Sequence, residues 1–463
     1  MDYAIQDILD GLPEVFQWLG EPGETGRRFQ GVSTDSRKIQ KGELFVAIRG
    51  DRFDGHDFVK QALDRGAVAA VVDRVWLAKE SGRKGLPLLV AEDTLQALKA
   101  LAGFHRQHFD LPVLALTGTV GKTTAKELIA AVLARAFRVL KNESSFNNAV
   151  GVSLTLFRLS NEHEFAVAEI GTNHPGEIYD LTDVVQPTAG LLLNVGRGHL
   201  EFFGDVQGVL REKLDLARWL SEHGRGPVFV NADDPLLASS SFFGLETVTF
   251  GQAEKTDVRV RLAGVEEGRA VVAFGGRRVR LGVPGVHHLT NAAAAVAVGQ
   301  YFGVPEGEIA AALAETQPAD HRGQISRVTG VTLVDETYNC NPESARAALE
   351  LLRTLPADRR VAVLGDMLEL GSVAEQEHKA LGRDLKEYDV DLLFAFGPLS
   401  ASTAEAAEET GVPAAHFDDK SALAQALLEF LQPGDAVLFK GSRGMRMEEV
   451  LNKVRDALRK REA

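Results

Sequence analysis

Residues 113–124 read VLALTGTVGKTT, and this stretch decides the fold of the region around it. The apolar run 113–116 predicts a short buried strand, and residues 125–135 predict a helix. The turn between them contains Gly118 and Gly121, and such a turn wraps backbone N–H groups around phosphate oxygens at a helix N-terminus. The sequence therefore predicts an ATP-binding loop in which Lys122 reaches the terminal phosphates and the Thr123 hydroxyl ligates Mg²⁺.

The match to the general phosphate-loop pattern is incomplete. That pattern has a glycine six residues before the lysine, where this chain has Leu116. An ordinary strand-to-helix turn with a chance Gly-Lys-Thr is the alternative, but strand, turn and helix follow in the required order. The loop indicates a nucleotide and leaves the reaction open. Its candidate nucleotide-binding residues are Gly118, Thr119, Gly121, Lys122, Thr123 and Thr124.

Length and composition indicate a globular protein of about three domains. Hydrophobic residues make up 45% and charged residues 25% of the chain, and no apolar run approaches the ~20 residues that span a bilayer. The acidic N-terminal residues do not resemble a signal peptide, and the single Cys340 excludes an intrachain disulfide, so we expect a cytoplasmic protein. The net charge of −14 argues against general nucleic-acid binding, yet local amides and cations can still hold an anionic ligand.

Alternation of strand-like and helix-like segments predicts an α/β protein with three domains. We expect a small α/β domain over 1–110, a central nucleotide-binding domain with a mostly parallel sheet over 111–316, and a doubly wound, Rossmann-like domain over 317–463. Within the central domain, residues 254–283 are rich in Val, Arg and Gly, with Gly275-Gly276 between two alternating runs. They predict a β-hairpin or a small antiparallel patch.

Polar residues follow several predicted strands of the central domain, where ligands bind in open α/β sheets. Glu169 ends the run 165–168 and is a candidate Mg²⁺ ligand, although an exposed strand-end glutamate is the simpler alternative. His199 lies just past another strand end and is a candidate for the same metal, although a lone histidine is more often a surface residue. Lys213, on the following helix, would by itself be interpreted as a solvated lysine.

Two segments of the third domain carry similar clusters. Residues 335–342 read DETYNCNP and place six polar side chains in eight positions. A turn tolerates that composition, and so does a site for a small zwitterionic substrate. Lys440 and Arg443 follow the strand 436–439, where a pair of cations suits a phosphate or carboxylate, and a plain basic turn is the alternative.

Taken together, these segments resemble the Mur ligases, the ATP-dependent amide-forming enzymes of peptidoglycan precursor synthesis, over nearly the whole chain. Residues 117–123 match the family's Thr-Gly-Thr-x-Gly-Lys-Thr loop, with Val120 where Asn is frequent. His199 and Lys213 match the family's metal-binding histidine and its commonly carbamylated lysine. The resemblance implies two Mg²⁺ ions, metal ligands at Thr123, Glu169, His199 and Lys213, and catalytic roles for Lys122, Glu169, His199 and Lys213.

The resemblance also implies the remaining ligand contacts. Residues 285–291 are similar to the adenine-side motif Gly-x-His-Asn-x-x-Asn, with His288 where Asn is usual and Asn291 retained. Arg322 and Glu336 are expected on the nucleotide. Expected substrate contacts are Ser33, Thr34, Asp35, Ser36, Arg37, Asn147, Asn148, Asn339, Asn341 and Lys440.

Residues 364–371 and 440–448 are most similar to the branch of the family that joins D-Ala-D-Ala to a UDP-linked muramoyl tripeptide through an acyl phosphate. We therefore expect ATP, Mg²⁺ and these small-molecule substrates as partners, with no nucleic acid and no membrane span, and a monomer. Two alternatives stay open at this point. One is a sister ligase that adds a single amino acid, and the other is a nucleotide-binding regulator without catalysis.

Overall fold

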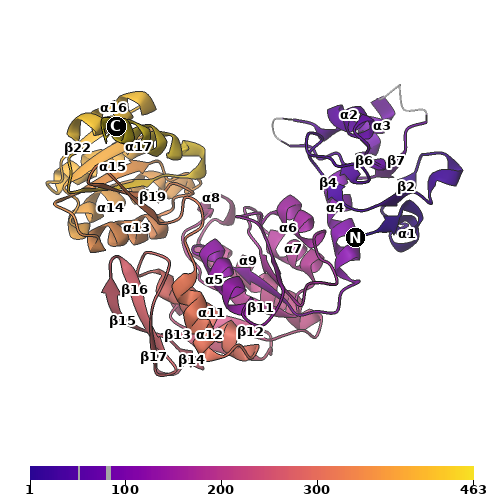
Figure 1. The fold of residues 1–463 in the computed structure, drawn as a ribbon, viewed down its shortest axis with the longest axis horizontal. Coiled ribbons are helices and arrows are strands. Elements are labelled where there is room, and N and C mark those ends of the chain that lie inside the picture. The colour runs from indigo at the N-terminus through magenta and orange to yellow at the C-terminus, as the bar shows by residue number, and fades with distance from the viewer. Residues whose placement is uncertain (51–52, 80–84, 463) are drawn as a thin grey trace. The chain divides into compact units, whose positions relative to one another are not determined.

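The computed structural model describes residues 1–50, 53–79 and 85–462, in which helices and strands alternate along the chain (Figure 1). The chain forms two compact units. The first comprises Met1–Ala115, Phe137–Thr172 and Glu177–Ala189, and the second comprises Leu116–Ala136, Asn173–Gly176 and Gly190–Ala463. The fold is α/β, with an N-terminal, a central and a C-terminal sheet, as the sequence predicts.

The N-terminal sheet has five strands in the order β2-β7-β6-β5-β4. Neighbours β4 to β7 pair in parallel, whereas β2 is antiparallel to β7. Helix α4 (Thr94–Arg106) follows the sheet and begins at Asp93, whose carboxylate accepts a hydrogen bond from the N–H of Gln96. The strands are β2 (Gln17–Trp18), β4 (Val32–Ser33), β5 (Leu44–Val46), β6 (Ala69–Asp73) and β7 (Leu88–Ala91).

The central sheet has seven strands in the order β14-β13-β12-β11-β8-β10-β9. All five residues of β8 are buried, as expected for a strand covered on both faces. The parallel pairing and the strands at the runs 113–116 and 165–168 are confirmed, whereas the outer strands β9, β13 and β14 were not predicted. The strands are β8 (Val113–Thr117), β9 (Val139–Lys141), β10 (Phe165–Glu169), β11 (Ala189–Leu192), β12 (Val228–Asn231), β13 (Thr247–Gly251) and β14 (Val258–Arg259).

Helix α5 (Lys122–Leu133) begins three residues earlier than the sequence predicts. Gly121 adopts a left-handed conformation, with φ of 79°, so the chain turns sharply and enters the helix at Lys122. The helix packs against α11 (His288–Tyr301). A Cβ atom on Gly299 of α11 would lie 2.6 Å from Cγ1 of Val132, so the close approach of the two helices depends on this glycine.

The predicted antiparallel patch is a three-stranded sheet made of β15 (Arg261–Glu266), β16 (Arg269–Phe274) and β17 (Arg277–Arg280). Gly275 and Gly276 both have positive φ and form the tight turn between β16 and β17. Helix α12 (Glu306–Glu315) packs against β17.

The C-terminal sheet has six strands in the order β18-β19-β23-β20-β21-β22, all parallel except β18. Two separate hydrophobic clusters line its faces, one with α13, α14 and α15 and the other with α16 and α17 (Figure 1). This is the predicted doubly wound arrangement. The strands are β18 (Gln324–Val328), β19 (Val331–Glu336), β20 (Arg359–Gly365), β21 (Leu392–Phe396), β22 (Ala414–Phe417) and β23 (Asp435–Lys440), and the helices are α13 (Pro342–Thr354), α14 (Ala374–Asp384), α15 (Ser400–Glu409), α16 (Lys420–Phe430) and α17 (Glu448–Glu462).

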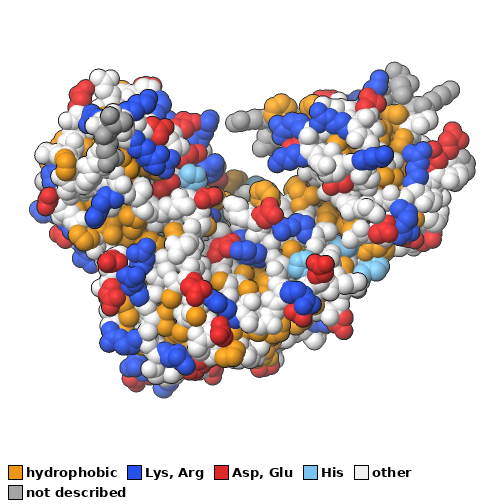
Figure 2. Space-filling model, in the orientation of Figure 1, with side chains coloured by type: hydrophobic (Ala, Val, Ile, Leu, Met, Phe, Trp, Pro, Cys, Tyr) orange, Lys and Arg blue, Asp and Glu red, His pale blue; other side chains and the backbone are white. Residues whose placement is uncertain are grey.

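The surface in Figure 2 carries Lys and Arg side chains interspersed with Asp and Glu. Such mixing gives no extended basic field on this face of the kind that binds nucleic acid. Among the described helices, none combines the length and the apolar character needed to cross a bilayer.

Candidate active site

The loop between β8 and α5 is held in shape by Asn194, which lies shortly after β11. Its Oδ1 accepts hydrogen bonds from the N–H groups of Thr119 and Val120, both at 2.9 Å, and its Nδ2 donates to the Val120 carbonyl at 2.9 Å. The Thr119 hydroxyl accepts a further bond from the N–H of Gly196. Asn194 was not predicted as a site residue, although an amide shortly after a buried apolar strand was a signal for it.

Lys122 lies across this loop and donates from Nζ to the carbonyls of Gly118 and Thr119, at 2.7 and 3.2 Å. The first N–H groups of any α-helix lack acceptors within the helix, so the start of α5 suits an anion. Both glycines are needed. A Cβ on Gly118 would lie 3.0 Å from that of Leu193, and one on Gly121 would lie 2.7 Å from Oδ1 of Asn291. The arrangement fits a bound triphosphate.

Asn291 and His288 lie together at the start of α11. Nδ2 of Asn291 donates to Nδ1 of His288 at 2.8 Å, so this ring nitrogen is an acceptor. Burial lowers the pKa of His288 well below its usual value, and the charges of His287 and Arg322 act in the same direction. Burial, reinforced by Lys440, also lowers the pKa of His287 to about 4. His288 is therefore a neutral imidazole beside the retained Asn291.

Residues at the carboxyl ends of β19 and β23 come together in the second unit. Glu336 and Lys440 are paired in register, and Nζ of Lys440 lies 3.6 Å from Oε2 of Glu336 and donates to the Asn339 carbonyl at 2.8 Å. Burial raises the pKa of Glu336, although Lys440 and Arg322 oppose this shift. The Arg322 guanidinium lies 3.7 Å from the centre of the Tyr338 ring. The structure thus brings Glu336, Asn339 and Lys440 together at one edge of the sheet.

Three predicted site residues of the first unit lie near one another. Nδ2 of Asn147 donates to Oε1 of Glu169 at 2.7 Å, and the Glu169 N–H donates to Oδ1 of Asn142 at 2.7 Å. Asn148 caps α6 (Ala149–Leu156), because its Oδ1 accepts from the N–H of Gly151. Glu169 is almost fully buried. Its carboxylate therefore has a fixed orientation and is not the exposed strand-end glutamate of the alternative interpretation.

The segment Ser33–Arg37 forms a turn after β4. The Arg37 guanidinium binds both carboxylate oxygens of Asp35 at 2.9 Å, and these hydrogen bonds lower the pKa of Asp35 to about 2. The Ser36 hydroxyl donates to Oε1 of Gln61 at 3.1 Å, whereas Arg37 projects from the surface. Thr34 lies in the same turn, so these five residues form one local cluster.

Lys213 is buried on α9 (Val206–Glu222), so it is not the solvated lysine of the simpler interpretation. Burial lowers the pKa of Lys213 to about 7; the charge of Lys122 contributes and that of Glu212 opposes. A neutral buried amine is the form that reacts with CO₂, so this position suits a carbamate.

His199 precedes the short helix α8 (Leu200–Phe203) and has a left-handed backbone, with φ of 55°. Its Nδ1 lies 2.6 Å from Oε2 of Glu369, and the contact with His199 lowers the pKa of that carboxylate. Glu369 was not predicted as a site residue. It lies in the loop after β20, far from His199 in the sequence, and only its place in the segment 364–371 drew attention to it.

Groups of three or more His, Cys, Asp or Glu side chains that could bind a metal do not occur among the described residues. A divalent metal here therefore needs other ligands, such as the Thr123 hydroxyl and a carbamate on Lys213. Mg²⁺ prefers oxygen ligands, which both groups supply, whereas the ammonium form of Lys213 would repel it. The residues thus fit Mg²⁺ provided that Lys213 is carbamylated.

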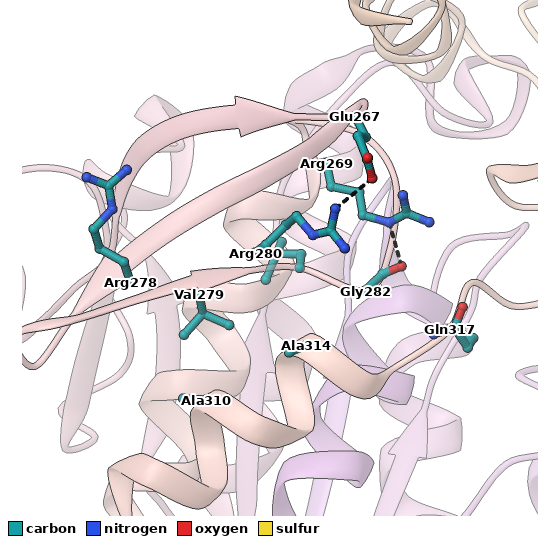
Figure 3. Close-up of a pocket in the computed structure, with 10 residues that line it drawn as sticks. Glu267, Arg269, Arg278, Val279, Arg280, Gly282, Ala310, Ala314 and Gln317 are labelled. Atoms are coloured by element: carbon teal, nitrogen blue, oxygen red, sulfur yellow. Dashed lines mark hydrogen bonds and ion pairs between the residues drawn. The ribbon is translucent and has the colours of Figure 1, made fainter.

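A cavity of about 680 Å³ lies elsewhere in the second unit, between β17 and α12 (Figure 3). Its arginines have partners within the protein. Arg280 pairs with Glu267 at 2.7 Å, and Nε of Arg269 donates to the Gly282 carbonyl at 3.2 Å. None of the loop residues 118–124 lines this cavity, so it is separate from the candidate active site.

Comparison with protein-family models identifies the class. Residues 28–106 match the model "Mur ligase family, catalytic domain", 116–299 match "Mur ligase middle domain", and 321–443 match "Mur ligase, glutamate ligase domain". These regions cover most of the chain. The chain belongs to the Mur ligase family, as the motifs in its sequence predicted.

Comparison with individual proteins shows which members of the Mur ligase family this chain is similar to. The chain is 34% identical to the UDP-N-acetylmuramoyl-tripeptide–D-alanyl-D-alanine ligase of Bacillus subtilis, over 94% of each chain. Its fold matches the crystal structure of MurF from Acinetobacter baumannii with a TM-score of 0.87 and 31% identity, covering 98% of this chain and 99% of the other. It also matches the MurF ligase of Thermotoga maritima in complex with ADP, with a TM-score of 0.80 and 29% identity, covering 93% and 98%.

Proposed function

We propose that this chain is an ATP-dependent ligase that joins D-Ala-D-Ala to UDP-N-acetylmuramoyl-tripeptide in peptidoglycan precursor synthesis. The observation that carries this proposal is the 34% identity to a ligase of that name over 94% of both chains. The similarity includes all three family regions and not the nucleotide loop alone. ATP is the nucleotide, which agrees with the fixed loop before α5 and with the ADP bound to the Thermotoga relative.

A carboxylate is a poor electrophile, so the reaction begins with its activation. An oxygen of the tripeptide's terminal carboxylate forms a bond to the γ-phosphorus, and ADP leaves. The amine of D-Ala-D-Ala then forms a bond to the acyl carbon and loses a proton, and phosphate leaves with that proton and with the oxygen that came from the carboxylate. The protein positions the reactants and neutralises charge in both steps.

The nucleotide is held by residues of the second unit. The amides that open α5 and the Lys122 ammonium bind the phosphates, with Gly118, Thr119, Gly121 and Thr124 shaping the loop. Asn291 lies on the adenine side, and Arg322 and Glu336 contact the nucleotide from the C-terminal sheet.

Thr123, Glu169, His199 and a carbamate on Lys213 are the residues that would hold two Mg²⁺ ions. The carbamate forms when the neutral amine nitrogen attacks CO₂ and loses a proton. When bound, Mg²⁺ neutralises charge on the phosphates and on the substrate carboxylate.

The two peptide substrates are assigned to different segments. Residues 33–37, with Asn147 and Asn148, bind the UDP-linked substrate, and Asn339, Asn341 and Lys440 bind the dipeptide. Asn148 and Asn341 use Oδ1 to cap helices, so Nδ2 is the atom that each offers to a substrate. We place the reaction in the cytoplasm, where ATP is available, and assign the activity to the monomer.

The test is phosphate release by the purified protein. Release requires ATP, UDP-N-acetylmuramoyl-tripeptide and D-Ala-D-Ala together, and each of the three mixtures that lacks one component stays at background. Release with a single amino acid in place of the dipeptide would favour a sister ligase instead. ATP binding without release in any mixture would favour a nucleotide-binding regulator.

A further inference from the structure

Carboxylates of the C-terminal region hold the loop that carries His199. The Arg197 N–H donates to Oε1 of Glu343 at 3.2 Å, and its guanidinium donates to Oε1 of Glu377 at 2.8 Å. Nδ1 of His199 lies 2.6 Å from Oε2 of Glu369. Glu369 is the one of these three carboxylates that contacts the imidazole itself.

The backbone that leads into Glu369 is held by two hydrogen bonds. The Met367 N–H donates to Nε2 of His378 at 3.0 Å, and the Leu368 N–H donates to the Ser442 hydroxyl at 2.9 Å. Glu369 has a φ of 63°, a conformation that a non-glycine residue adopts only where its surroundings impose it. A Cβ on Gly371 would lie 3.2 Å from Cα of Glu201, so the segment after Glu369 approaches α8 closely here.

The contact occupies Nδ1 and leaves Nε2 as the ring nitrogen away from Glu369. A carboxylate only accepts, so a hydrogen bond along this contact requires the proton on Nδ1 and leaves the lone pair on Nε2. Histidines that bind metals generally donate their other ring N–H to such a partner, which fixes the tautomer and the ring orientation.

We propose that Glu369 is a positioning residue that holds His199 with Nδ1 protonated, so that Nε2 is the metal-binding atom. This inference rests on the proposed function, which makes His199 a metal ligand. Because Glu369 belongs to the C-terminal region and His199 to the middle region, the metal site is complete only when these two regions are in contact.

The experiment measures Mn²⁺ binding to the full-length protein with ADP present, by electron paramagnetic resonance. Glu369→Ala lowers the affinity for the Mn²⁺ ion that depends on His199 about tenfold. This is the lower end of the loss seen when the hydrogen-bond partner of a metal-binding histidine is removed. Glu369→Gln weakens it less, because the amide oxygen still accepts from Nδ1. Glu377→Gln is the matched control. This substitution removes one negative charge from the contact between Glu377 and Arg197, which does not involve the imidazole of His199. It leaves the affinity for Mn²⁺ unchanged.

Nitrogen-15 NMR of histidine-labelled protein supplies a second measurement. His199, assigned by its loss in His199→Gln, shows the Nδ1–H tautomer in the parent protein and a mixture in Glu369→Ala. The inference is overturned if Glu377→Gln weakens Mn²⁺ binding as much as Glu369→Ala, or if the tautomer is the same in all variants. If His199→Gln itself leaves Mn²⁺ binding unchanged, the metal assignment in the proposed function fails instead.

Discussion

The amine of Lys213 should react with CO₂ near neutral pH, unlike that of an exposed lysine. Burial lowers the pKa of Lys213 from 10.5 to about 7. At pH 7 about half of this amine is neutral, against roughly 0.03% at the ordinary pKa, which is a gain of about a thousandfold in the reactive form. The carbamylated fraction at a fixed concentration of dissolved CO₂ should therefore depend on pH in the neutral range.

The direction of this pH dependence follows from the pKa of the Lys213 amine. The neutral amine increases as the pH rises through 7, so reactivation by CO₂ should increase from pH 6 to pH 8 and then level off. The assay removes CO₂ at pH 6, restores it at the same dissolved concentration at each pH, and measures ligase activity under one standard condition. With ¹³C-labelled bicarbonate, NMR should show a carbamate signal that rises in parallel with activity.

Lys213→Gln is the control, since it keeps a polar side chain and cannot form the carbamate. It should show neither the signal nor reactivation. A midpoint near pH 10, or full activity of Lys213→Gln, would refute the link between burial and the metal ligand.

Three further predictions concern the nucleotide loop. Lys122→Ala should lower kcat by about 10²–10³-fold while the protein still folds, because the lost cation stabilises transferring phosphate; steady-state kinetics and circular dichroism check this, and unchanged kcat would contradict it. Asn194→Ala leaves the Val120 N–H without its acceptor and the Thr119 N–H with only the longer bond to the residue 194 backbone carbonyl. It should cost about 1–3 kcal/mol in the free energy of unfolding, measured in urea, and weaken ATP binding, measured by calorimetry; no change in either quantity would contradict a role for Asn194. Gly121→Ala forces an alanine into a left-handed conformation with its Cβ against Asn291, and it should lower the free energy of unfolding by more than about 1 kcal/mol. The control Gly26→Ala, whose Cβ would have nothing within 4 Å, should change the free energy of unfolding by no more than about 0.5 kcal/mol. Equal effects of the two substitutions would contradict the close packing at Gly121.

The sequence was sufficient for the strands with strong apolar runs and for the helices that follow them. β8 and β10 lie where the apolar runs predicted them, because a strand buried on both faces needs almost continuous apolar residues. Strands β14 and β18 are short or partly exposed and have no such signal. The start of α5 was misplaced because the left-handed conformation of Gly121 depends on its surroundings.

The candidate site was only partly predictable for a related reason. Lys122 and Glu169 occupy positions that local pattern and strand ends identify. The lowered pKa of Lys213 depends on burial by residues from other elements, and the sequence alone made this lysine look solvated. Asn194 and Glu369 act on residues far away along the chain, so their contacts follow from the fold and from no local motif.

The most direct test of the central claim follows one oxygen atom. The terminal carboxylate of UDP-N-acetylmuramoyl-tripeptide is labelled with ¹⁸O, and the phosphate released in the complete reaction is analysed by mass spectrometry. If an acyl phosphate forms, each released phosphate carries one ¹⁸O atom from the carboxylate, and release requires D-Ala-D-Ala. Unlabelled phosphate would show that water attacked ATP instead, and the assignment of this chain as a ligase would be wrong.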